Sequence, residues 1–174
     1  MRQVLKLHAD SVCEAVSAIE VDVARPAPNE LALTYRLTGV IAGLVLPAQA
    51  APARTDELWR HSCFEAFVQP KGGEGYFEVN LAPSTRWAAY RFDGYRQGMA
   101  PALGDPGIAV TTGAQSLEVR AALTLAEAAS APWRVGISAV IEEAGGRISY
   151  WALAHPPGRP DFHHDAGFVV ELSP

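Results

Sequence analysis

The stretch CFEAFVQPKGGEGYFEVNL, from Cys63 to Leu81, decides the fold. Two runs rich in aromatic and β-branched residues flank the glycine-rich segment 71–75, and this pattern is typical of two strands joined as a β-hairpin. Because the side chains of a strand point alternately to its two faces, each run has one apolar face and one mixed face. The mixed faces carry Glu65, Glu78 and Asn80. If the runs pair, we expect these three polar side chains to lie close together on one surface.

Similar short runs recur about every ten residues along the chain, separated by Gly, Pro, Asn and Asp. This spacing predicts an all-β fold, an antiparallel β-sandwich of the immunoglobulin-like or jelly-roll type with about 10–12 strands. We expect short helical turns at 55–60 and 124–130, the second with the capping-box spacing of Thr124 and Glu127. The expected strands are 3–8, 17–24, 30–38, 40–46, 63–69, 75–82, 86–92, 107–112, 116–123, 133–142, 147–153 and 167–172.

Composition predicts one globular domain over residues 1–174, since no repeat and no long linker divides the chain. The net charge is -5, and Lys occurs only at Lys6 and Lys71, which argues against nucleic acid as a partner. The N-terminus alternates apolar and polar residues and lacks the continuous apolar core of a signal peptide. The apolar run after Arg36 is shorter than a membrane span, and we interpret it as a buried strand and a loop. We therefore expect a cytoplasmic protein without a membrane partner.

An acid in an apolar strand needs a partner, because an isolated buried carboxylate costs several kcal/mol. For Glu65, two explanations remain open. The first is structural: an ion pair with Arg86, Arg91 or Arg96, or hydrogen bonds to loop amides. The second is a ligand whose hydroxyl groups meet the carboxylate. Trp59, six residues earlier, also has two possible roles: a plug at the end of the sandwich, or a flat platform for a sugar ring.

Three segments carry a family resemblance: LWRHSCFEAFV at 58–68, YFEVNLAPSTRWAAYRFDGYRQGM at 76–99 and HPPGRPDFHHDAGFVVEL at 155–172. Together they resemble the DOMON-like group of bacterial proteins, which is related to family 9 carbohydrate-binding modules. The resemblance implies a β-sandwich that binds a small ligand, commonly a sugar and in other branches haem. It covers the chain from about Asp56 onward.

The resemblance also implies roles for individual residues. In the sugar-binding modules a Trp lies six residues before a strand carboxylate, an Arg follows the next strand, and a second aromatic residue near the C-terminus closes a clamp. Trp59, Glu65 and Arg86 match the first three positions. The second aromatic falls around Phe162 or His163, where the modules have a Trp. We expect non-catalytic carbohydrate recognition with Trp59 stacked on the ring and Trp87 in packing; the expected ligand-binding residues are Trp59, Glu65, Glu78, Asn80, Arg86, Arg91, Phe162 and His163.

The C-terminal tail and the family resemblance also suggest metal and haem chemistry. The tail residues His155, Asp161, His163, His164 and Asp165 suggest a metal site, but adjacent histidines usually point apart. The alternative function is a haem- or metal-binding sensor, with haem or calcium as its cofactor. Met99 is the internal methionine that could be an axial ligand of haem. We expect no bound cofactor.

Enzymatic signatures are lacking as well. No nucleophile elbow, phosphate loop or zinc-protease motif occurs, and His61 beside Cys63 is not by itself an activated pair. Glu65 and Glu78 could serve glycoside hydrolysis only at a suitable separation. Cys13 and Cys63 are interpreted as buried thiols.

Overall fold

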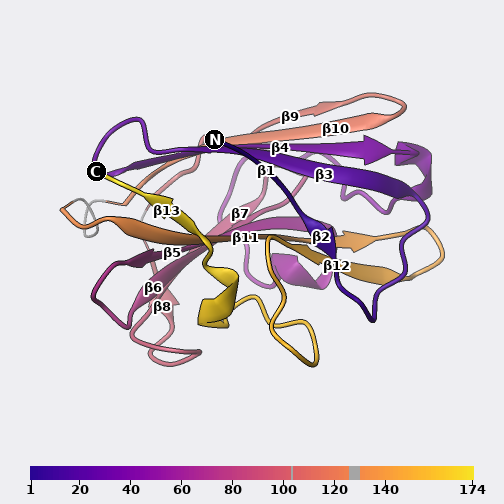
Figure 1. Cartoon of the computed structure of the whole chain (residues 1–174). Coiled ribbons are helices and arrows are strands. Elements are labelled where there is room, and N and C mark those ends of the chain that lie inside the picture. The colour runs from indigo at the N-terminus through magenta and orange to yellow at the C-terminus, as the bar shows by residue number, and fades with distance from the viewer. Residues whose placement is uncertain (103, 126–129) are drawn as a thin grey trace.

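Two antiparallel sheets pack face to face in the computed structural model, which describes residues 1–102, 104–125 and 130–174 (Figure 1). The predicted β-sandwich is therefore confirmed. The first sheet, here sheet A, has the strand order β1 (Arg2–Val4), β3 (Val16–Ala24), β4 (Glu30–Gly39), β10 (Ser116–Thr124), β9 (Ala109–Thr112). Sheet B has the order β2 (Lys6–Leu7), β12 (Ile148–Ala152), β11 (Trp133–Glu142), β5 (Cys63–Pro70), β6 (Tyr76–Leu81), β7 (Trp87–Phe92), β8 (Ala100–Pro101), with β13 (Val170–Leu172) beside β11.

The core lies between the sheets and follows from the period-two alternation of the strands. In β4 the alternate residues Leu31, Leu33, Tyr35 and Leu37 are buried. Across the core, Tyr35 packs on Phe64 with ring centroids 5.0 Å apart, and its hydroxyl donates a hydrogen bond to the Glu65 carbonyl oxygen at 2.7 Å. The apolar face of β5 is thus the inner face of sheet B, and its mixed face points away from sheet A.

The segment 40–46 is not the strand that the apolar run predicts. Its residues Ile41–Gly43 form a 3₁₀ turn, η1. The Ile41 N–H donates to the Ala114 carbonyl beside sheet A, whereas the Val45 N–H donates to the Glu142 carbonyl of sheet B. Because this segment crosses from one sheet to the other, it cannot pair along its length with either, although Ile41 and Leu44 are buried as expected.

Other boundaries differ for similar reasons. The single strand predicted at 3–8 is divided at the buried Leu5, because β1 pairs with β3 in sheet A while β2 pairs with β12 in sheet B. The strand expected at 167–172 is shorter, since Asp165–Gly167 form a 3₁₀ turn, η4. The turn expected at 55–60 is present as η2 (Leu58–Arg60), and the one at 124–130 lies largely outside the described residues. Among the described residues, no helix is long and apolar enough to span a membrane.

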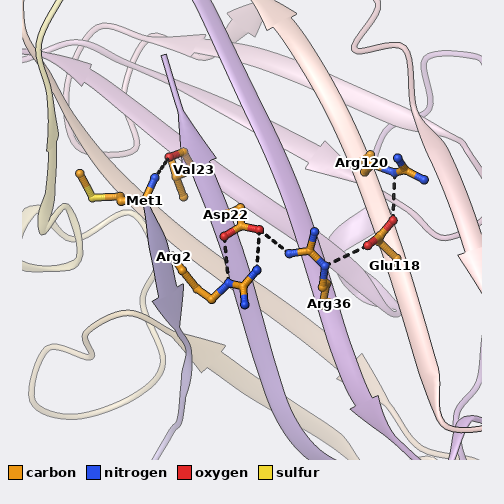
Figure 2. A network of polar contacts seen from close by, with 7 residues as sticks. All are labelled: Met1, Arg2, Asp22, Val23, Arg36, Glu118 and Arg120. Atoms are coloured by element: carbon orange, nitrogen blue, oxygen red, sulfur yellow. Dashed lines mark hydrogen bonds and ion pairs between the residues drawn. The ribbon is translucent and has the colours of Figure 1, made fainter. Parts of the chain in front are cut away.

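The outer face of sheet A carries a ladder of alternating charges (Figure 2). Asp22 on β3 accepts hydrogen bonds from Arg2 on β1 and from Arg36 on β4. Arg36 also contacts Glu118 on β10 at 3.0 Å, and Glu118 contacts Arg120 on the same strand at 2.9 Å. Cross-strand pairs of opposite charge stabilise a sheet and help to fix its register.

Candidate functional site on the outer face of sheet B

The β5–β6 hairpin brings the predicted polar residues together. In its register Glu65 lies opposite Asn80, and Phe67 lies opposite Glu78. The neighbouring strands extend this outer face, with Ser138 of β11 opposite Glu65 and Tyr90 of β7 opposite Glu78. The sequence pattern therefore placed these side chains correctly on one surface.

This surface is covered rather than open. Glu65 is 3% exposed, Glu78 6% and Asn80 1%. The cover comes from η2 and from the C-terminal segment, residues 154–169, which Figure 1 shows in yellow and orange on the side of sheet B away from sheet A. Their apolar side chains join a second hydrophobic cluster, which comprises Leu58, Phe67, Tyr76, Ala88, Tyr90, Phe92, Phe162 and Phe168.

The two covered carboxyl groups have few partners. The Ser138 hydroxyl donates to Glu65 Oε2 at 3.4 Å, while Glu65 Oε1 is buried and accepts no hydrogen bond among the described residues. Asn80 Nδ2 donates to Glu78 Oε1 at 2.6 Å, and His163 Nε2 lies 3.7 Å from Glu78 Oε2. In the described part of the chain, no arginine forms an ion pair with Glu65. Arg96, one of the expected partners, instead pairs with Asp161 at 2.8 Å.

Burial sets the ionisation of these groups. It raises the pKa of Glu65 well above its ordinary value, and the nearby Glu78 charge adds to the rise. The pKa of Glu78 is also raised by burial, against the opposing hydrogen bond from Asn80. Burial and the positive charge of Arg96 lower the pKa of His163 to about 4. All three shifts favour the neutral form of the group.

His163 is the link between this layer and the surface. Tyr76 Oη lies 2.7 Å from His163 Nδ1, and the same oxygen accepts the Arg96 backbone N–H at 3.2 Å. The imidazole packs edge-on against Phe67 and Phe92, with ring centroids 5.1 and 5.2 Å apart. Tyr76 and the aromatic rings therefore hold His163 in a fixed orientation above Glu78.

The remaining predicted residues are spread over the face. Trp59 on η2 is 50% exposed, and the Arg60 guanidinium lies 5.4 Å from its ring. Arg86 follows a tight turn in which the Ala82 N–H donates to the Arg86 carbonyl, so it lies at the same end of β6 as Asn80 rather than near Tyr76. Arg91 on β7 pairs with Phe77 on β6, so its side chain lies on the opposite face of sheet B from Glu78. Phe162 lies over β11 and β12, near Ser138 and 6.1 Å from the ring of Tyr150.

The residues considered for metal, haem and thiol chemistry have other contacts or lie exposed in the structure. Within the described ranges, no group of three or more His, Cys, Asp or Glu side chains could hold a metal ion. His155 bonds to the Lys6 carbonyl, Asp161 to Tyr95 and Arg96, and Met99 is 62% exposed. Cys13 and Cys63 are not paired with each other, and burial raises the pKa of the Cys63 thiol. Trp87 packs against the main core, as predicted.

A groove of about 580 Å³ opens at the Tyr76 end of the outer face. The β5–β6 hairpin, the turn after β7, the start of β11 and the C-terminal segment form its walls. Of the predicted ligand-binding residues, His163 alone lines it, beside His164 and Asp165 of the predicted metal site. Its lining residues are Gln69, Gly73, Glu74, Tyr76, Gly94, Tyr95, Arg134, His163, His164, Asp165 and Phe168.

The fold defines a class of β-sandwich that includes carbohydrate-binding modules. A candidate carbohydrate-binding protein from Bacteroides uniformis ATCC 8492 superposes with a TM-score of 0.69 at 15% identity, over 97% of this chain and 84% of that one. A family 9 carbohydrate-binding module from Caldicellulosiruptor kristjanssonii in complex with cellotriose gives a TM-score of 0.55 at 10% identity, over 91% and 74% of the two chains. A complex of a family 9 module from the same organism with glucose gives 0.50 at 9% identity, over 88% and 76%. At these low sequence identities, the likeness shows a shared fold and no more than that. No protein-family model and no curated protein matches the sequence.

Proposed function

We propose that this protein binds carbohydrate on the outer face of sheet B and does not transform it. The observation that carries the proposal is a pair of half-exposed aromatic rings, Trp59 and Tyr95, at the margins of this face, together with the partly exposed Arg86. Aromatic faces and convergent polar groups are what a saccharide needs for recognition. Support also comes from similar solved structures, two of which contain cellotriose or glucose.

η2 leads into the start of β5, which pairs with the end of β6. At this end of the face, here called the Trp59 end, the indole stacks on a sugar ring and Arg86 donates hydrogen bonds to its oxygens. Both residues reach the surface of the molecule. Glu65, Glu78 and Asn80 lie beneath the C-terminal segment, so a sugar meets them directly only when that segment moves. With the segment in place, these three side chains do not contact the sugar. Phe162 and His163 then act as part of the cover rather than as a second clamp opposite Trp59.

A binding role fits the two carboxyl groups better than hydrolysis does. Glycoside hydrolysis requires one acid and one carboxylate on either side of an accessible bond. Here both groups are buried and both have raised pKa values. Glu65 and Glu78 lack the access to a glycosidic bond that cleavage needs.

The test is isothermal titration of the purified protein with glucose, cellobiose and cellotriose, followed by analysis of the recovered sugar. We expect saturable binding and unchanged sugar. Trp59→Ala should weaken binding at this end by about tenfold or more with an unchanged melting temperature, while the matched Trp59→Phe keeps most of it. The proposal fails if none of the sugars binds, and the non-catalytic part fails if cleavage products accumulate. An absorption spectrum and metal analysis of the same sample check the haem- or metal-binding alternative.

A further inference from the structure

The groove at the Tyr76 end has the features of a preformed ligand site. Its volume of about 580 Å³ lies in the range of small-molecule sites. Trp59 and Arg86 are not among its lining residues, so the groove is separate from the surface that these two side chains form.

Tyr95 gives the groove an aromatic platform that is both exposed and fixed. The side chain is 55% exposed, yet its hydroxyl donates a hydrogen bond to Asp161. It lies in a tight turn, in which the Gln97 N–H donates to the Gly94 carbonyl and the Asp93 N–H donates to the Gln97 carbonyl. Because its position is already set, stacking a ligand on this ring costs little conformational entropy.

Arg134 gives the groove an oriented set of donors. One terminal nitrogen donates to Gln69 Oε1 at 3.1 Å, and the other donates to the Asp165 carbonyl at 2.9 Å. A guanidinium has five N–H donors, so these two bonds hold its plane and leave further donors for a ligand. Gln69 is held in turn, since its amide nitrogen donates to the Glu74 carbonyl at 3.3 Å.

The charges of the groove match a neutral ligand. Arg134 supplies one positive charge, while Glu74 and Asp165 supply carboxylates, and His163 is held neutral in the wall. His164 Nδ1 lies 3.3 Å from Asp165 Oδ1. Donors and acceptors of both kinds suit hydroxyl groups, which donate and accept at once, whereas an acidic sugar would meet the negative charges of Glu74 and Asp165.

We propose that this groove is a second saccharide site, separate from the Trp59 end, which takes a neutral mono- or disaccharide on Tyr95 and Arg134. The inference rests on the proposed function for the chemical class of its ligand. The site itself follows from the groove. Its preference for neutral over acidic sugars follows from Glu74 and Asp165.

Amide and indole NMR spectra of the ¹⁵N-labelled protein separate the two ends in one titration. With cellobiose, the amides of Gly73 and Gly94 should shift saturably, and glucuronate should bind there about tenfold more weakly. Tyr95→Ala should weaken the cellobiose response of these amides by about tenfold, while Tyr95→Phe, which keeps the ring, stays within about threefold of wild type. Arg134→Gln provides a second variant outside the turn, and should also weaken it.

The outcomes are distinguishable. If cellobiose shifts only the Trp59 indole and leaves Gly73 and Gly94 unmoved, the groove is not a saccharide site and the proposed function stands. If Tyr95→Ala and Arg134→Gln both bind as wild type does, the groove proposal is likewise overturned. If glucuronate binds at least as tightly as cellobiose, the preference for neutral ligands is wrong. If no sugar moves any signal, the proposed function fails as well.

Discussion

The acidic side chains on the outer faces of the two sheets lie in opposite environments. On sheet A, Asp22 and Glu118 remain in contact with water and alternate with arginines across the four strands β1, β3, β4 and β10 (Figure 2). On sheet B, Glu65 and Glu78 lie under η2 and the C-terminal segment, and neither forms an ion pair with an arginine in the described part of the chain. A solvated acid needs only a nearby opposite charge, whereas a covered acid without one shifts towards its protonated form.

The two faces should therefore respond to pH with opposite signs. The pKa of Asp22 is held well below its ordinary value by hydrogen bonds from Arg2 and Arg36, so its contribution to stability is present above that ordinary value and is lost in acid. The pKa of Glu65 is raised by burial. The folded protein keeps this proton where the unfolded chain has lost it, so stability falls as the pH rises above the ordinary value of 4.5.

The largest effect should come from removing part of the cover on sheet B. Phe168 is 3% exposed, stacks on Phe67 with centroids 5.9 Å apart, and lies so near Gly136 that a Cβ there would be 2.6 Å from its ring. We expect Phe168→Ala to lower the free energy of unfolding by about 3–5 kcal/mol, as in a hydrophobic core. Urea denaturation measures this.

The neighbouring Val169 is the matched control, since it is 53% exposed. Val169→Ala should change the free energy of unfolding by less than about 0.5 kcal/mol. Equal small effects of the two substitutions would mean that the C-terminal segment is only loosely attached, and the contrast between a covered and an open face would disappear.

The next effect compares one acid from each face. Glu65→Gln removes a buried carboxyl whose Oε1 has no partner, so we expect the free energy of unfolding near pH 8 to rise by about 1–2 kcal/mol, and the gain to shrink towards pH 4.5. Glu118→Gln removes two partly exposed ion pairs and should lower it by at most about 1 kcal/mol. Urea denaturation across this pH range measures both. Destabilisation by Glu65→Gln at every pH would show that the native carboxylate is ionised and paired.

Alternation in the sequence was sufficient to predict which hairpin residues share a face, because the period of two is a property of the extended backbone. It placed Glu65 beside Asn80 without any knowledge of the rest of the chain. It could not predict that this face is covered, because the cover includes Phe162, His163 and Phe168, about a hundred residues further on. A mixed face looks the same in sequence whether water or another segment lies over it.

Two site details depended on geometry that the sequence pattern does not contain. The turn that sets Ala82 against Arg86 determines which β7 residues point outward, and it puts Arg91 on the other face from Glu78. The groove is built from four separate segments, so no single motif marks it. The one local sequence signal for the groove is Tyr95. This aromatic residue lies between Gly94 and Gly98, in a turn that does not favour burial of its side chain.

The smallest effect should come from the ladder on sheet A. Asp22→Asn removes the negative charge that Arg2 and Arg36 share, but these side chains are solvated, so salt screens their interaction. We expect a small decrease in melting temperature near pH 7 at low salt, which disappears in about 1 M NaCl and also in acid, where the native carboxylate is protonated as well. Glu20→Gln on the same strand, opposite Arg36, is the control and should change the melting temperature less. Only charges withdrawn from water escape screening by salt. A decrease in melting temperature that persists at high salt, or that equals the effect of Phe168→Ala, would therefore mean that this ladder is rigid and desolvated.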